Sequence, residues 1–150
     1  MHIMHIIDSL VPGGAERMLV DIANASAVVF DQAADGTHIG SISGTGSLTK
    51  TGTGNVTLVG TNTYSGGTSV LGGSLTATTG SVQGEVATVA GASLAFDQAG
   101  TSTWGGTVSG AGGLIKNGTG VLVLTGASTN TGGTTVNGGI LQIGAGGTTG

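Results

Sequence analysis

One stretch decides the expected fold: residues 44–67 read GTGSLTKTGTGNVTLVGTNTYSGG. From Gly44 to Gly66, glycines and apolar residues stand two positions apart. In an extended chain alternate side chains point to one face, so Val56 and Leu58 share a face and the threonines beside them share the other. Glycine in such a pattern marks turns or close approaches of the backbone. The stretch therefore predicts short β-strands separated by glycine-rich turns.

The chain repeats this pattern once, without a gap. When Ala27–Gly84 is laid over Ser93–Gly150, 26 of the 58 aligned pairs are identical, and Lys50 falls on Lys116. A long repeat with alternating apolar residues is typical of stacked supersecondary units. Each unit is expected to hold about three coils of roughly 22 residues.

These features predict an all-β fold, a right-handed parallel β-helix of about six coils. One coil cannot bury its narrow apolar face without neighbours, so the coils must stack. Glycine accounts for 33 of 150 residues without a strict triplet, which excludes collagen, and charged residues are only 7%. The fixed apolar pattern argues against disorder. A β-sandwich is the rival architecture, but strict repetition and paired glycines at the corners favour the solenoid.

Charge and cysteine content exclude several classes of function. The net charge is −4, and Arg17, Lys50 and Lys116 are the only fixed cations. Nucleic acids and anionic membranes need a basic patch, which three dispersed cations cannot form. The chain has no cysteine, so it has no disulfide framework and no thiolate metal site. No stretch reaches the roughly 18 apolar residues of a membrane-spanning helix.

Residues 1–24 differ in composition from the rest of the chain. They hold all three methionines and the only proline, but only two of the 33 glycines. We therefore divide the chain into a segment 1–26 and two tandem 66-residue repeats over 27–150. His2–Asp8 is predicted as a strand and Pro12–Gly14 as a loop. The helical stripe that follows is expected to cap the first coil; it consists of Ala15, Met18, Leu19, Ile22 and Ala23.

The N-terminal segment resembles the opening of GT-B glycosyltransferases of the family-4 type. The resemblance rests on residues 6–17, IIDSLVPGGAER, and residues 19–24, LVDIAN. It implies a loop at Gly13 and Gly14 near the phosphates of a nucleotide sugar. So short a piece of such an enzyme cannot hold a donor sugar. A truncated glycosyltransferase-like protein is therefore an alternative reading, as is a chimeric or artificial fusion.

The repeats resemble the passenger-associated β-helix repeat of Gram-negative autotransporters. The resemblance covers Gly44–Leu75 and Gly110–Leu141, and the second copy departs from the family pattern at Ser128 and Asn130. It implies a non-enzymatic, adhesin-like passenger segment at the cell surface or outer membrane, or secreted. A translocator barrel is expected outside this chain. Expected partners are further copies at the open β-helix ends, or ligands on a host surface.

Four side chains at equivalent positions of the repeats invite a functional reading. Lys50 and Lys116 are expected at coil corners, with their ammonium groups in solvent where they add solubility. His38 aligns with Trp104, so that position accepts a large ring and is expected to serve packing or to lie at the surface. We therefore expect no catalytic or ligand-binding role for these four residues.

No catalytic residue, cofactor or metal ligand is predicted from the remaining polar residues. Asp31 and Asp97 recur, but one carboxylate in each repeat is poor coordination for a cation, so a role in a turn is expected. His2 and His5 lie three apart on a predicted strand and therefore on opposite faces. Only four acidic residues follow Asn24, and they form no recognisable catalytic pair.

Overall fold

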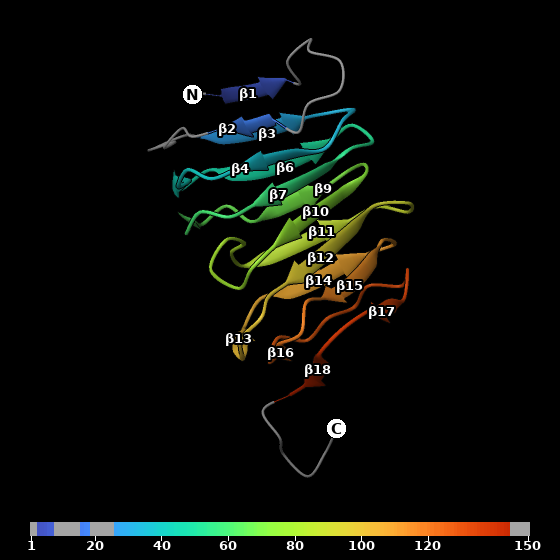
Figure 1. Ribbon diagram of the computed structural model, residues 1–150. Coiled ribbons are helices and arrows are strands. Elements are labelled where there is room, and N and C mark those ends of the chain that lie inside the picture. The colour runs from blue at the N-terminus through green and yellow to red at the C-terminus, as the bar shows by residue number, and fades with distance from the viewer. Residues whose placement is uncertain (1–2, 8–15, 19–25, 145–150) are drawn as a thin grey trace.

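The computed structural model describes residues 3–7, 16–18 and 26–144 and shows a parallel β-solenoid of about six turns. The chain winds steadily from the blue N-terminal end to the red C-terminal end of the stack (Figure 1). The strand pairings within these residues are all parallel. The predicted all-β solenoid is confirmed. The rival β-sandwich is excluded, since sandwiches are built from antiparallel sheets.

Three walls of stacked strands form the solenoid, and we call them faces 1, 2 and 3. Face 1 contains, in order of neighbours, β1 (Ile3–Ile7), β3 (Ala27–Asp31), β6 (Ser47–Thr51), β9 (Thr68–Val70), β11 (Glu85–Thr88) and β14 (Thr107–Gly110). Face 2 contains β2 (Glu16–Met18), β4 (Gly36–His38), β7 (Asn55–Leu58), β10 (Ser74–Ala77), β12 (Ser93–Asp97), β15 (Gly113–Asn117) and β17 (Thr134–Val136).

Face 3 is made of two shorter sheets. One pairs β5 (Ser43–Gly44) with β8 (Thr63–Tyr64), and the other contains β13 (Ser102–Trp104), β16 (Val121–Leu124) and β18 (Ile140–Ile143). Residues 80–84 connect the two sheets. The Asn62 backbone N–H donates to the carbonyl of Gly80 at 3.0 Å, and the Trp104 indole N–H donates to the carbonyl of Val82 at 3.3 Å. Each full coil therefore passes through face 1, face 2 and face 3 in turn.

The coils are shorter than the sequence suggested. On face 1, Val28 pairs with Leu48 and Leu48 with Thr68, so each of these coils advances the residue number by 20. The next coil, from Thr68 to Val86, is two positions shorter, and the coil from Val86 to Val108 is two positions longer. The expected coil length is wrong for most of the stack. It came from dividing the 66-residue repeat by three, whereas the repeat also contains one additional strand, β11.

That additional strand turns the second repeat by one face relative to the first. The repeat equivalent of β3 on face 1 is β12 on face 2, and the equivalent of β4 on face 2 is β13 on face 3. The same shift relates β6 to β15 and β7 to β16. One repeat thus spans three coils and a third, and equivalent residues of the two copies point in different directions.

The two described strands of the N-terminal segment, β1 and β2, belong to the solenoid. β1 confirms the predicted strand and pairs in parallel with β3. The helix expected from Ala15 onward is wrong at Glu16–Met18, which forms β2 beside β4. A helix of eight or nine residues gains little by itself in water, whereas the edge of the stack offers ready backbone partners. Gly13, Gly14, Ala15, Leu19, Ile22 and Ala23 lie outside the described residues.

Most inward side chains belong to one apolar cluster that runs along the axis, which we call the apolar column. Val28, Leu48, Val86 and Leu94 are each 1% exposed or less. Glycine at the corners lets successive coils approach closely, since a Cβ on Gly60 would lie 1.9 Å from the carbonyl oxygen of Gly40. No helix in the described part of the chain is long and apolar enough to span a membrane.

Candidate functional site

The most unusual feature of the interior is the buried Lys50. It stands at an inward position of β6, and its side chain is 0% exposed. Its ammonium donates to the carbonyl of Thr51, to that of Gly52 at 2.9 Å and to that of Gly72 at 3.2 Å. Gly72 belongs to the next coil, so the ammonium joins two coils. Burial lowers the pKa of Lys50 below its ordinary 10.5, while the charges of Asp31 and Asp35 act in the opposite direction.

Lys116 repeats this arrangement on face 2. It is 0% exposed, and its ammonium donates to the carbonyl of Asn117, to that of Gly118 at 3.0 Å and to that of Gly138 at 3.3 Å. The expectation that both lysines reach solvent is therefore wrong. A signal for burial was available, because Lys50 stands two residues after Leu48 and so shares its inward face. We call the lysine and its three carbonyls the lysine clamp.

The lysine clamp occupies the same surroundings in both repeats. Lys50 lies between Phe30 in the coil before and Val70 in the coil after. Lys116 likewise lies between Phe96 and Val136. The aliphatic stem of each lysine packs in the apolar column while the ammonium reaches the turn carbonyls, which is how long cationic side chains usually divide their contacts.

A ring pair stands beside each lysine clamp. The rings of Phe30 and His38 are 5.4 Å apart in an edge contact, and those of Phe96 and Trp104 are 5.0 Å apart and tilted. His38 is 1% and Trp104 4% exposed. Of the two expectations for this position, packing or the surface, burial of both rings confirms packing and rules out the surface. Because of the shift between repeats, the first pair joins faces 1 and 2 and the second joins faces 2 and 3.

Asn62 connects three successive coils. Its side-chain oxygen accepts from the Ile42 backbone N–H at 2.7 Å, and its amide donates to the Ser81 carbonyl at 2.6 Å. The second repeat has Ser128 at this position. The Ser128 hydroxyl accepts from the Val108 N–H at 3.2 Å and so keeps one of the two contacts. The serine at this position therefore replaces the asparagine only in part, because it makes one of the two hydrogen bonds.

Tyr64 stands at the position of the second departure from the family pattern, where the second repeat has Asn130. Its phenol is buried and lies 2.7 Å from the hydroxyl of Thr68, and burial raises its pKa above the ordinary 10.0. Its repeat equivalent, Asn130, is half-buried and donates to the Gly133 carbonyl at 3.1 Å. The second repeat therefore lacks the buried ring on this side of the turn.

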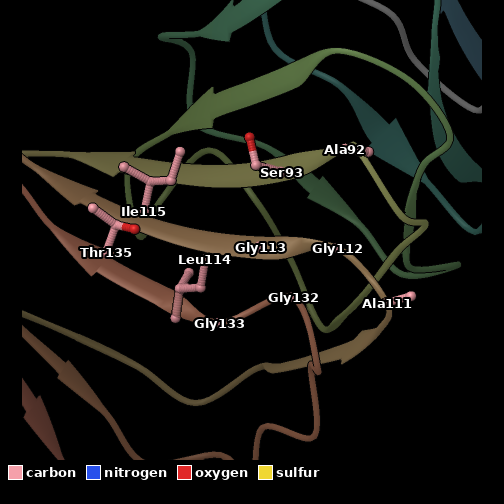
Figure 2. A pocket seen from close by; sticks show the side chains of 11 residues that line it. Ala92, Ser93, Ala111, Gly112, Gly113, Leu114, Ile115, Gly132, Gly133 and Thr135 are labelled. Carbon is pink, nitrogen blue, oxygen red and sulfur yellow. The ribbon is translucent and has the colours of Figure 1, made fainter.

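The outer surface is hollowed at the paired glycines. One hollow of about 300 Å³ lies over Gly112–Gly113 and Gly132–Gly133. Figure 2 shows it flanked by the side chains of Ser93, Ile115 and Thr135. A second hollow, of about 200 Å³, lies at the equivalent Gly66–Gly67 turn, on face 1 beside Glu85. Both lie beside paired glycines, which carry no side chains that could fill them.

The acidic residues do not converge. Asp31 and Asp97 lie on the exposed surface at the ends of β3 and β12. The carboxylate of Asp35 accepts from the Asn55 N–H at 2.8 Å, and that of Glu85 accepts from a serine hydroxyl at 3.1 Å. Among the described residues, no three His, Cys, Asp or Glu side chains form a group that could hold a metal ion. His2 lies outside those residues, and His5 falls within β1.

Comparison with known proteins finds similarity between the repeats and autotransporter sequences. Residues 48–77 and 114–143 match the passenger-associated-transport-repeat family. The chain is also similar to the adhesin BmaC autotransporter of Brucella suis biovar 1 (strain 1330). The identity is 42% over an alignment of 150 residues in length, and the aligned part of this chain is 76% of it. The aligned part is 4% of that adhesin, so the chain spans a small piece of its relative's length. No solved structure matches the chain.

These findings confirm the resemblance of the repeats to autotransporter passenger material. Each matched segment contains one lysine clamp, two Gly-Gly pairs and the valine of the following coil. The second match includes Ser128 and Asn130, so the departures there do not remove the similarity. Neither matched segment reaches residues 1–24, and the resemblance to glycosyltransferases at Gly13 and Gly14 has no support.

Proposed function

We propose that this chain is a non-enzymatic, adhesin-like passenger segment of an autotransporter-type protein at the cell surface or secreted from it. The observation that carries the proposal is the coincidence of sequence and structure in the two matched segments. Residues 48–77 and 114–143 match the passenger repeat, and each begins in a lysine-bearing strand and ends on the next coil. The similarity to the Brucella adhesin supports the same reading.

The segment acts as a rigid spacer whose outward side chains are available for contact. Its interior is filled mostly by apolar side chains, and glycines stand at its corners. Its described acidic residues lie toward the surface while both lysines are buried, so the outer surface of residues 26–144 is acidic or neutral. Such a surface disfavours anionic partners such as nucleic acids or anionic membranes. Neutral host-surface ligands suit it better.

The C-terminal end of the stack supports a second contact, with a further coil or a further copy. Val136, Ile140 and Ile143 are 49%, 58% and 66% exposed on the last coil. Strand edges at an open end accept additional strands, and exposed apolar side chains there gain from being covered. Self-association through this end belongs to the proposal.

Surface display tests the proposal. The chain is placed between a secretion signal and the translocator of an unrelated autotransporter, and intact cells are treated with protease. Appearance of the chain outside the cell and adhesion of the displaying cells to host cells would support an adhesin-like passenger. Retention inside the cell, or display without adhesion above cells that carry the translocator alone, would contradict it.

The same material separates this proposal from the glycosyltransferase alternative. The purified chain is titrated with nucleotide sugars and followed by calorimetry. We expect no saturable heat. Saturable binding that disappears in the Gly13→Ala, Gly14→Ala double variant would overturn the non-enzymatic reading.

A further inference from the structure

Both lysine ammonium groups are held by backbone carbonyls. The hydrogen bonds of the Lys50 ammonium go to Thr51, Gly52 and Gly72, and those of Lys116 go to three carbonyls at the equivalent positions. Three carbonyls that converge on one point form a cation site, since each carbonyl directs its negative end inward.

The carbonyls converge because of the turn that follows the strand. Gly52 has a φ of +73° and Gly118 a φ of +70°, a left-handed conformation that glycine adopts without strain. A Cβ on Gly52 would lie 2.2 Å from the Gln32 carbonyl oxygen, and one on Gly118 would lie 2.4 Å from that of Gln98. Both turns are thus fixed by two constraints, local conformation and the preceding coil. The oxygens of the site all belong to the backbone.

We propose that the turn carbonyls of each repeat form a binding site for a primary ammonium ion, and that the lysine is its tethered occupant. The ammonium neutralises three inward carbonyl dipoles and joins two coils through one group, since Gly52 and Gly72 lie on successive coils. One coil further along the stack the lysine position is taken by Val70 or Val136. Each repeat therefore carries one such site.

Two alternative roles for the buried lysines lead to different predictions. If the aliphatic stem alone mattered, methionine would replace lysine without loss, because it fills a similar volume. If the charge served attraction to acidic residues, the ammonium would contact a carboxylate. The hydrogen-bond partners of both ammonium groups within the described part of the chain are carbonyls.

Chemical rescue tests the proposal. The Lys50→Ala variant keeps the carbonyls and removes three methylenes and the ammonium, a fragment that n-propylammonium reproduces. We expect the melting temperature of this variant to rise with n-propylammonium chloride and to saturate, as it does for a ligand that binds the folded state. The wild-type chain and the Gly80→Ala variant are expected not to change, because their sites are filled.

Matched additives and a second variant keep the outcome decisive. 1-Propanol supplies the stem without the charge, and tetramethylammonium supplies charge without an N–H donor. An equal rise with either compound, or no rise with n-propylammonium, would overturn the proposal. If Lys50→Ala does not fold, its refolding is followed by circular dichroism in n-propylammonium, where recovery supports the site and its absence contradicts it. A Lys50→Met variant as stable as the wild type would also contradict it, since the carbonyls would then need no N–H donor.

Discussion

Lys50 and Lys116 occupy the same position of the repeat but lie on different faces of the solenoid. Lys50 is on β6 of face 1 and Lys116 on β15 of face 2. Each is buried and each holds a carbonyl of the following coil. A repeat of three coils and a third moves equivalent residues by one face, so three consecutive repeats of this kind would return to the starting face after ten coils. Surface features of successive repeats then point in three directions.

Burial of both lysines predicts slow reaction with amine reagents. In the folded chain an acylating reagent must wait for local opening before it reaches either ammonium. We expect Lys50 and Lys116 to be modified about a hundredfold more slowly in buffer than in denaturant, since buried segments open rarely. Peptide mass spectrometry measures both sites in one sample. Equal rates with and without denaturant would show that the side chains lie in solvent.

Close packing of the coils predicts a strong difference between two glycines. A Cβ on Gly60 would lie 1.9 Å from the Gly40 carbonyl oxygen, whereas a Cβ on Gly80 meets nothing within 4 Å. We expect Gly60→Ala to lower the free energy of unfolding by about 3 kcal/mol, the upper range for overpacking. Gly80→Ala is expected to change it by about 0.5 kcal/mol or less. Urea unfolding of the two variants gives the comparison, and similar losses would contradict the packing described.

The contacts of Asn62 predict a larger effect there than at its equivalent. Asn62→Ala leaves the Ile42 N–H and the Ser81 carbonyl without their side-chain partner, and we expect a loss of about 3 kcal/mol. Ser128→Ala removes a single contact, to the Val108 N–H, and is expected to cost about 1 kcal/mol. Both losses are measured from the urea concentration at the midpoint of unfolding, provided that the slope of the unfolding free energy against urea is unchanged. A smaller loss at Asn62 than at Ser128 would be inconsistent with its bridging role.

The shifted pKa values predict opposite slopes of stability with alkaline pH. Lys50 has a lowered pKa in the folded state, so the unfolded chain binds more protons and stability rises as the pH approaches 10.5. Tyr64 has a raised pKa, so above 10.0 the unfolded chain loses its proton first and stability falls.

Two variants separate these contributions. Tyr64→Phe keeps the rise that belongs to Lys50 and removes the fall above 10.0, while Lys50→Met removes the rise and keeps the fall. Urea unfolding across the alkaline range on both sides of these two pKa values measures the slopes. The pH dependence of stability is compared between Lys50→Met and the wild type just below the ordinary pKa of lysine. The same pH dependence in both would contradict the burial of the ammonium.

The sequence predicted the architecture because its signals are local and repeated. Alternation around Val56 and Leu58 defined the strands, and the paired glycines defined the corners. The expectation for Lys50 was wrong because its charge favours solvent, whereas its inward position places it in the column. The carbonyls that hold it belong to turns of successive coils, and no local pattern brings those together.

Long-range partners that a linear pattern does not reveal account for the remaining differences. The stripe of residues 15–23 has helical spacing, yet Glu16–Met18 pairs with β4 because the end of the stack offers backbone hydrogen bonds. The coil length is overestimated when β11 is not counted as an additional strand within the repeat. The contacts of Asn62 with two neighbouring coils likewise depend on register, which the sequence does not specify by itself.

The turn by one face between repeats is the central structural claim, and a single cross-link tests it. Ser74 of the first repeat pairs with Ser93 of the second on face 2. Neighbouring strands lie about 4.8 Å apart, within the range of Cα separations that a disulfide spans. The chain has no native cysteine, so a Ser74→Cys, Ser93→Cys variant is expected to form an intramolecular disulfide on mild oxidation. The longer coil expected from the sequence would instead bring Leu71 beside Ser93. Rapid cross-linking of the Leu71→Cys, Ser93→Cys pair and none at Ser74 and Ser93 would contradict the turn between the repeats.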